Sequence, residues 1–221
     1  MKNSLTQIPV GATWLLCLLI TMASCDLELQ DTFEFKGELG PLITFEDQTA
    51  WEWLQTQTTP TTDTVLAGDK FDYLLQAIEL TGLVDEYNQT ATQDRTYLLL
   101  NNNAFEGEND IIDVVTGSTD GDLANADVAM LKSLLQYHIV EAYIDQVPTL
   151  FEYGVDYKFQ TLNPGEEGAI YFRRDERYRV DINESPQLPS TARDTRVYNH
   201  NYVFQNGIAH HLNSYVRNVP F

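Results

Sequence analysis

Four histidines carry most of the acid–base and metal-binding potential of the sequence. His138 follows a run of apolar residues at helical spacing, and His210 lies three residues after Gly207. Adjacent side chains of a strand point to opposite faces, so His210 and His211 cannot bind the same ion. A zinc site needs three or four converging ligands, and the fourth histidine, His200, lies in a charged and aromatic stretch. We therefore expect no zinc site, and we interpret His138 and His210 as structural residues whose rings bond backbone carbonyl groups.

A cluster of acidic residues has the hard oxygen ligands that Ca²⁺ prefers. Asp120 and Asp122 flank a glycine, and Asp113 and Asp127 are nearby. The spacing lacks the glycine and the glutamate of an EF-hand loop, which favours an acidic loop exposed to solvent. The sequence also has no P-loop, GxGxxG, GxSxG or HExxH string. These observations predict no metal, no cofactor and no catalytic site, and hence a protein that is not an enzyme.

Residues 171–179 combine aromatic and basic side chains, two types that are enriched in contact surfaces. The candidate contact residues are Tyr171, Arg173, Arg174, Arg177 and Tyr178, with Phe172 and Arg179 beside them. One interpretation is a local positive surface for an acidic protein partner or an anionic glycan. The alternative is a hairpin whose arginines pair with Asp175, Glu176 and Asp181 across the strands.

The charge of the whole chain excludes two classes of partner. The sequence has 13 Lys and Arg against 33 Asp and Glu, and its net charge is −20. Nucleic-acid binding needs a basic footprint, and electrostatic docking on anionic lipid needs one as well. The hydrophobic fraction of 43% and the aromatic fraction of 11% are typical of a folded domain. The sequence therefore predicts an acidic globular protein that does not bind nucleic acid.

The first 24 residues have the pattern of an export signal. They contain one charge, Lys2, and an apolar run over residues 14–23 that is too short to span a membrane. Ala23 and Ser24 precede Cys25, after which the sequence becomes acidic. This pattern resembles the lipobox of bacterial lipoproteins, which implies acylation of Cys25, cleavage before it, and a lipid anchor in the outer membrane with the protein exposed at the cell surface. The alternative is an ordinary secretory signal with Cys25 at the cleavage site by chance.

The remaining chain divides into a tether and one domain. We expect a signal peptide over residues 1–24, an acidic tether over residues 25–47 and a domain over residues 48–221. Helices are predicted over residues 50–54, from an N-cap at Asp69 to Gly82, and over residues 126–137 with Val128 facing inward. A buried strand is predicted over residues 96–100. Further strands are predicted over residues 138–144, 156–162, 169–174, 178–182, 196–204 and 208–216. Helices that precede strands indicate the α+β class.

Three local motifs in this order resemble the fasciclin domain. Residues 97–105 resemble its first conserved box, a hydrophobic strand that runs into an Ala-Phe pair. Tyr137 and His138 lie in a Leu-x-Tyr-His-Val-Val-like segment. Asn206, Gly207 and His210 lie in an Asn-Gly-Val-Ile-His-like segment. The resemblance covers residues 49–221. It departs from the family pattern at residues 101–103, which are all asparagine, and at residues 173–194, which are longer and more charged than the usual hairpin.

The resemblance implies a fold in which helices pack against a mostly antiparallel sheet or wedge. It also implies adhesion, or the binding of a protein or polysaccharide at the cell surface, without catalysis. The alternative function is an accessory lipoprotein of a SusC/SusD-type nutrient importer, which would contact the glycan or the TonB-dependent transporter.

Overall fold

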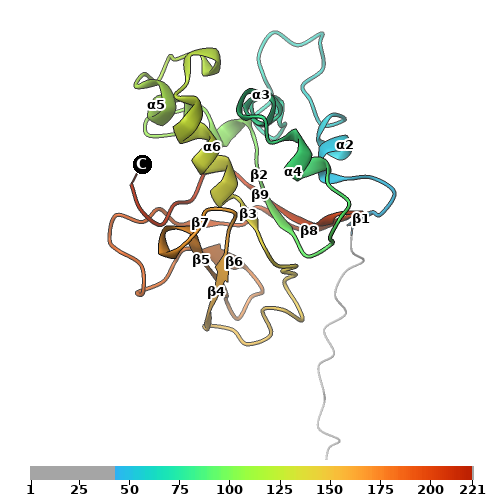
Figure 1. The fold of residues 1–221 in the computed structure, drawn as a ribbon, viewed down its shortest axis with the longest axis vertical. Helices are drawn as coiled ribbons and strands as arrows, with labels where there is room; N and C mark the ends of the chain where they lie inside the picture. The colour runs from blue at the N-terminus through green and yellow to red at the C-terminus, as the bar shows by residue number, and fades with distance from the viewer. Residues whose placement is uncertain (1–42, 221) are drawn as a thin grey trace, which may run out of the picture. The chain divides into compact units, whose positions relative to one another are not determined.

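The computed structural model describes residues 43–220 (Figure 1). The predicted signal peptide, Cys25 and residues 26–42 of the predicted tether lie outside the described residues. The end of that tether is part of the domain, which corrects the predicted boundary: Ile43–Phe45 form strand β1, which pairs with the strand β8 (Asn199–Phe204). The physical reason is the packing of Phe45, whose ring centroid lies 5.7 Å from that of Trp53 and 5.8 Å from that of Phe204.

The larger sheet has five strands in the order β1-β8-β9-β2-β3. In addition to β1, its strands are β8 (Asn199–Phe204), β9 (Gly207–Leu212), β2 (Thr96–Leu100) and β3 (Ile139–Val140). The pairs β1–β8 and β2–β9 are parallel, whereas β8–β9 and β2–β3 are antiparallel. This sheet is therefore mixed, because the β8–β9 hairpin inserts between two strands that come from much earlier in the chain.

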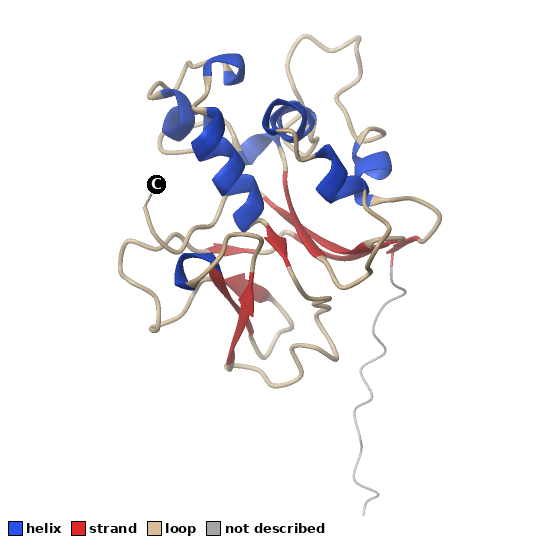
Figure 2. Ribbon diagram, viewed as in Figure 1, coloured by secondary structure: helices blue, strands red, loops and turns tan. Residues whose placement is uncertain are grey.

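The smaller sheet has four strands and is antiparallel throughout. Its strands, in spatial order, are β4 (Asp156–Gln160), β5 (Ala169–Arg174), β6 (Val180–Ile182) and β7 (Thr195–Arg196). Figure 2 shows the α-helices on one side of the larger sheet, and the smaller sheet on its other side with the short 3-10 helix Glu166–Gly168. The helices are α2 (Ala50–Leu54), α3 (Asp72–Thr81), α4 (Val84–Asn88), α5 (Ile111–Thr116) and α6 (Val128–Tyr137). The predicted α+β class is confirmed.

The core lies between the helices and the larger sheet. Every residue of β2 is buried, as its continuous apolar sequence predicts. Helices α3 and α6 contact each other and bury Leu74, Ile78, Leu131 and Leu134 in the same core cluster. None of the helices within residues 43–220 is long and apolar enough to cross a lipid bilayer.

Two details of the helix predictions are wrong. Helix α3 begins at Asp72 and not next to Asp69, because the Asp72 carboxylate accepts hydrogen bonds from the backbone and hydroxyl of Thr59 and thereby fixes the preceding loop. Val128 does not face inward but is 42% exposed, since it lies in the first turn of α6 at the edge of the core. The predicted end of α3 is confirmed, because Gly82 adopts the left-handed conformation with φ of 67°.

The strand predictions also need correction at their ends. The strand predicted over residues 138–144 contains only Ile139–Val140, because the hydroxyl of Thr96 bonds the carbonyl of Ala142 and the amide of Ile144 in place of a ladder. The strand predicted over residues 196–204 is divided at residues 197–198, and its second part forms β8, whose register with β9 shifts between Asn199 and Tyr202. Its first residue, Arg196, forms β7 together with Thr195 and pairs with β6 in the smaller sheet instead.

Candidate functional site

The two histidines of the sequence motifs are bonded to the backbone through both ring nitrogens. Nδ1 of His138 lies 2.8 Å from the Leu134 carbonyl, and its Nε2 accepts a hydrogen bond from the Val216 amide at 3.1 Å. Nε2 of His210 lies 2.8 Å from the Ile144 carbonyl, and its Nδ1 accepts from the Asn201 amide at 3.2 Å. Burial lowers the pKa of His138 to about 4 and that of His210 to about 3. Both rings are therefore neutral at neutral pH, and both nitrogens of each ring are used in hydrogen bonds to the backbone.

The other motif residues join elements that are distant in sequence. The Asn206 side chain accepts a hydrogen bond from the Ala50 amide at 2.9 Å and donates to the Tyr87 carbonyl at 2.8 Å. Gly207 has φ of 146°, and a Cβ there would lie 2.4 Å from the Arg95 carbonyl oxygen. These contacts connect the β8–β9 turn to α2, to α4 and to the residue before β2.

Tyr137 makes a similar connection between α6 and the smaller sheet. Its hydroxyl donates a hydrogen bond to the Ala169 carbonyl at 2.8 Å and accepts one from the Asn183 side chain at 3.0 Å. The tyrosine is 2% exposed. All five motif residues thus face protein atoms.

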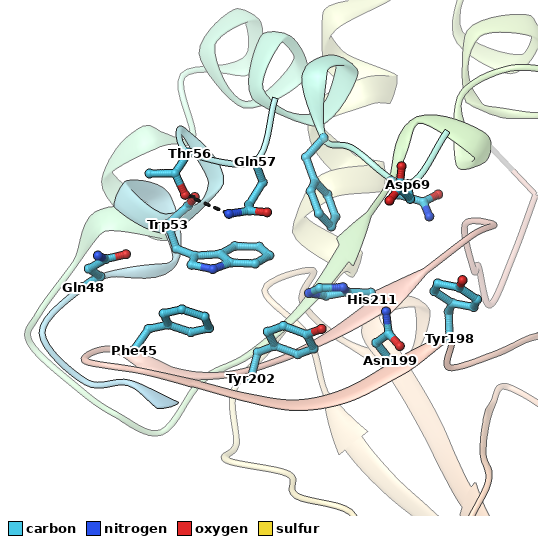
Figure 3. Close-up of a pocket in the computed structure, with 12 residues that line it drawn as sticks. Phe45, Gln48, Trp53, Thr56, Gln57, Asp69, Tyr198, Asn199, Tyr202 and His211 are labelled. Atoms are coloured by element: carbon cyan, nitrogen blue, oxygen red, sulfur yellow. Dashed lines mark hydrogen bonds between the residues drawn. The ribbon is translucent and has the colours of Figure 1, made fainter. Parts of the chain in front are cut away.

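An open cleft of about 420 Å³ lies between the α2 region and strands β8 and β9 (Figure 3). We call it the aromatic cleft. It is lined by Phe45, Gln48, Trp53, Thr56, Gln57, Asp69, Phe71, Asn101, Tyr198, Asn199, Tyr202 and His211. In Figure 3, Trp53 and Gln57 come from the helix side, whereas Tyr202 and His211 come from the strands. The lining is aromatic, with amides, the hydroxyls of Thr56, Tyr198 and Tyr202, and one carboxylate.

The imidazole of His211 lies at the centre of the aromatic lining. Its centroid is 4.0 Å from the ring of Tyr202 in a stacked arrangement with an interplanar angle of 28°. The indole of Trp53 lies 5.4 Å away, and the ring of Phe71 meets the imidazole edge-on at 5.1 Å. His211 therefore points to the opposite face from His210, as the alternation of strand side chains predicts.

Two buried polar atoms of the cleft are unpartnered. Among the described residues, Nε2 of His211 and Oδ1 of Asn101 have no hydrogen-bond partner. The Asn101 amide nitrogen is used, because it donates to Oδ1 of Asn213 at 2.6 Å. Burial lowers the pKa of His211 to about 4, so its ring is neutral at neutral pH, with one nitrogen that donates and one that accepts. An unpaired buried polar atom costs about 1–3 kcal/mol, which a bound ligand can offset.

The aromatic and basic cluster of residues 171–179 is arranged differently from the predicted positive surface. Tyr171 is 7% exposed and Arg174 is 6% exposed, so neither is available to a partner. Arg173 pairs with Asp156 at 2.8 Å, and Arg179 pairs with Asp175 at 2.6 Å. Of the five predicted contact residues, Arg177 and Tyr178 are exposed. The expectation of a contact surface made by all five is corrected for Tyr171 and Arg174, which the pairing of β4, β5 and β6 encloses, whereas Arg173 is half-buried beside Asp156.

The buried Arg174 holds two loops together. Its Nε donates to the Leu150 carbonyl at 2.6 Å, its Nη2 donates to the Phe151 carbonyl, and its guanidinium lies 4.6 Å from the centroid of the Tyr178 ring. The Gly154 amide donates to the Arg174 carbonyl at 2.7 Å. The loop before β4 and the β5–β6 turn are thus joined at one end of the smaller sheet.

This end of the smaller sheet exposes large aromatic side chains. Phe151 is 71% exposed, Tyr153 is 66% exposed and Tyr178 is 41% exposed. We call these three residues, with Arg177, the hairpin surface. Sequence reasoning missed Phe151 and Tyr153, because the loop that carries them is remote in sequence from the β5–β6 turn.

The acidic cluster has a local structural use. Asp122 accepts a hydrogen bond from the Ala124 amide, and Asp127 accepts hydrogen bonds from the Ala129 and Met130 amides at the start of α6. Within residues 43–220, no group of three or more His, Cys, Asp or Glu side chains is arranged to hold a metal ion.

Comparison with known proteins identifies the family. The model of the fasciclin domain matches residues 69–217. No curated protein matches the sequence. Among solved structures, the chain is similar to a FAS1 domain pair from the insect cell adhesion molecule fasciclin I, with 16% sequence identity and a TM-score of 0.47. That similarity covers 76% of this chain and 50% of the insect structure, so the chain spans about half of its length. The family match covers more than half of the sequence and includes both predicted motifs around His138 and His210, and the chain therefore belongs to the fasciclin domain family.

Proposed function

We propose that this chain is a non-enzymatic binding protein of the cell surface, anchored by lipid on Cys25, which contacts a protein partner through the hairpin surface. Fasciclin domains often occur in cell-adhesion or binding proteins, and this family assignment supports the binding role. The pattern of residues 14–25 supports the anchor. The observation that carries the proposal is the exposure of Phe151, Tyr153 and Tyr178 on loops that a buried arginine fixes.

Three exposed aromatic residues beside an arginine are the residue types that dominate the binding energy of protein interfaces. The bonds of Arg174 to the Leu150 and Phe151 carbonyls hold the loop in one conformation. A preordered surface loses less conformational entropy on binding than a mobile loop does. The hairpin surface therefore has both the composition and the rigidity that a protein contact needs.

The histidines of the motifs support binding over catalysis. General acid–base catalysis needs a titratable group with a free nitrogen or oxygen within reach of a substrate. His138 and His210 bond backbone groups through both ring nitrogens, and their lowered pKa values keep them neutral over the physiological range. This arrangement favours a structural role for both residues.

The lipid anchor is tested by metabolic labelling. Growth with a radiolabelled fatty acid is expected to label the wild-type protein and not the Cys25→Ser variant, because the thiol is the acylated group. Cys17→Ser is the matched control, since this cysteine lies in the predicted signal peptide. Equal labelling of wild type and Cys25→Ser would contradict the anchor.

The protein contact is tested by crosslinking the intact lipoprotein on cells and identifying the captured proteins by mass spectrometry. Phe151→Ala combined with Tyr153→Ala is expected to reduce capture of the specific partner at least tenfold. Tyr198→Ala, at 58% exposure in the aromatic cleft, is the matched control and is expected to leave capture unchanged. Capture that survives the double substitution would contradict a contact at the hairpin surface. A transporter of the TonB-dependent class as the specific partner would assign the binding role to nutrient uptake.

A further inference from the structure

We propose that the aromatic cleft is a binding site for a neutral saccharide, separate from the protein contact at the hairpin surface. The cleft volume of about 420 Å³ is within the range of small-molecule sites and accommodates one or two sugar rings. The site opens to solvent next to strand β8, where Tyr198, the residue before the strand, is 58% exposed. A longer glycan can therefore continue beyond the cleft.

The aromatic faces of the cleft fit the apolar faces of sugar rings. Phe45 and Tyr202 are half-buried, so part of each ring is available. Trp53 and Phe71 are 4% and 2% exposed; Trp53 packs against both half-buried rings from the helix side, and Phe71 packs against Trp53 and His211. Pyranose rings present faces of C–H groups that pack on aromatic rings in the same way as other apolar groups. The open arrangement forms a platform, and the covered rings of Trp53 and Phe71 leave no closed cage of the kind that encloses a cation.

The polar groups of the cleft fit hydroxyl groups. Gln48, Gln57 and Asn199 offer amide donors and acceptors at the rim, and Asp69 offers an exposed carboxylate acceptor. A saccharide hydroxyl donates one hydrogen bond and accepts others, so it can bond the amide donors, the amide acceptors and the carboxylate. Amides and a carboxylate beside aromatic faces therefore favour a polyhydroxylated ligand over a purely apolar one.

The two unpartnered atoms at the inner wall point to the same ligand class. Oδ1 of Asn101 can only accept a hydrogen bond, whereas Nε2 of the neutral His211 donates or accepts according to its tautomer. Asn101 is 2% exposed and His211 is 6% exposed, so bulk water does not compensate these atoms. A ligand with hydroxyl groups can satisfy both, which turns an unfavourable feature of the free protein into affinity for the ligand.

The charge of the cleft disfavours an anionic ligand. No lysine or arginine lines the cleft within the described part of the chain, and its one charged residue is Asp69. The net charge of −20 adds a repulsive field for anions. Uronic acids and sulfated or phosphorylated sugars are therefore disfavoured, which leaves neutral hexoses and pentoses.

The experiment is isothermal titration of the full-length protein, solubilised in detergent, with oligosaccharides of three to six glucose, mannose, galactose or xylose units. Oligoglucuronate and a trilysine peptide are the charged probes. We expect at least one neutral oligosaccharide to bind and both charged probes to bind at least tenfold more weakly. Tyr198→Ala is expected to lower the affinity at least tenfold. Tyr153→Ala, the same substitution at similar exposure on the hairpin surface, is the matched control and should bind as the wild type does.

A second variant tests the inner wall. His211→Phe keeps an aromatic ring against Tyr202 but removes both ring nitrogens, and it is expected to lower the affinity at least fivefold with the melting temperature retained. Failure of all neutral oligosaccharides to bind would overturn the proposal, as would tighter binding of either charged probe. Equal weakening by Tyr198→Ala and Tyr153→Ala would also overturn it. None of these outcomes depends on the protein partner, so the two proposals fail separately.

Discussion

Aromatic side chains gather at two separate places on the domain, the aromatic cleft and the hairpin surface. In the cleft, Trp53 and His211 are 4% and 6% exposed, and a buried nitrogen of His211 has no partner among the described residues. On the hairpin surface, Phe151 and Tyr153 are 71% and 66% exposed, and the guanidinium of the buried Arg174 bonds backbone carbonyls. The cleft thus combines covered rings with incomplete hydrogen bonding, whereas the hairpin surface combines exposed rings with complete bonding beneath them.

This difference separates two kinds of binding. Where the polar groups beneath a surface already have hydrogen-bond partners, the surface can bind another folded protein that only covers its aromatic rings. A concave site with unsatisfied polar atoms gains the most from a ligand that brings its own donors and acceptors. The domain therefore has the features of a protein contact at one end and of a small-ligand site at the other.

Acidification should produce the largest change in the free energy of unfolding, because three buried histidines, His138, His210 and His211, lie in or next to strands of the larger sheet. Burial lowers the folded-state pKa of His138, His210 and His211 to about 4, 3 and 4, below the unfolded value of about 6.5. The unfolded chain takes up protons first, so stability is complete above pH 6.5 and is lost as the pH falls towards 4. From pH 7 to pH 5, each of these histidines should cost about 2 kcal/mol of unfolding free energy.

Urea denaturation at the two pH values measures this loss. The free energy of unfolding at pH 7 exceeds that at pH 5, and His211→Phe should reduce this difference by the contribution of one histidine, about 2 kcal/mol. An unchanged difference in this variant would show that His211 is already protonated or exposed in the folded state. The hairpin surface contains no histidine, so it should not contribute to the loss of stability between pH 7 and pH 5.

Substitution of Arg174 should produce the next largest change. Arg174→Ala leaves the Leu150 and Phe151 carbonyls without their charged donor, and it should lower the free energy of unfolding by about 3 kcal/mol. It should also release the loop that carries Phe151 and weaken partner capture. Arg177→Ala, an exposed arginine on the same turn, is the control and should change stability by less than about 0.5 kcal/mol. Equal losses of unfolding free energy in the two variants would contradict the structural role assigned to the buried Arg174.

The smallest expected changes are those of the exposed tyrosines. Tyr198→Ala and Tyr153→Ala should each alter the free energy of unfolding by less than about 0.5 kcal/mol, because both side chains are more than half exposed. Thermal denaturation checks this expectation. A loss above about 1 kcal/mol in either variant would mean that its binding defect reports a change of fold rather than a lost contact.

The sequence predicts the fold better than it predicts the sites. The continuous apolar run of β2, the helical spacing of α6 and the turn at Gly207 act locally, so their patterns identify the elements that form. The role of Arg174 depends on carbonyl groups more than 20 residues away in the chain. A basic residue in a strand looks exposed by composition alone, and only the packing of the loop over it shows that it is buried.

The aromatic cleft is hidden from sequence reasoning for a related reason. Its lining comes from segments around residues 45–57, 69–71, 101, 198–202 and 211, which no local pattern connects. The parallel pairing of β1 with β8 brings Phe45 to Tyr202, with their ring centroids 6.4 Å apart. Aromatic residues concentrated near Trp53 were the available signal, but their convergence with His211 depends on the mixed topology of the sheet.

The most direct test of the account compares the histidine ring nitrogens before and after ligand binding. Nitrogen-15 NMR of the full-length protein would follow the ring nitrogens of His138, His210 and His211 as the tightest-binding neutral oligosaccharide is added. The account predicts a shift for His211, whose Nε2 is unpartnered, and no shift for His138 and His210, whose nitrogens already bond backbone groups. Saturation of the protein with an unchanged His211 ring would contradict the assignment of the aromatic cleft as the ligand site.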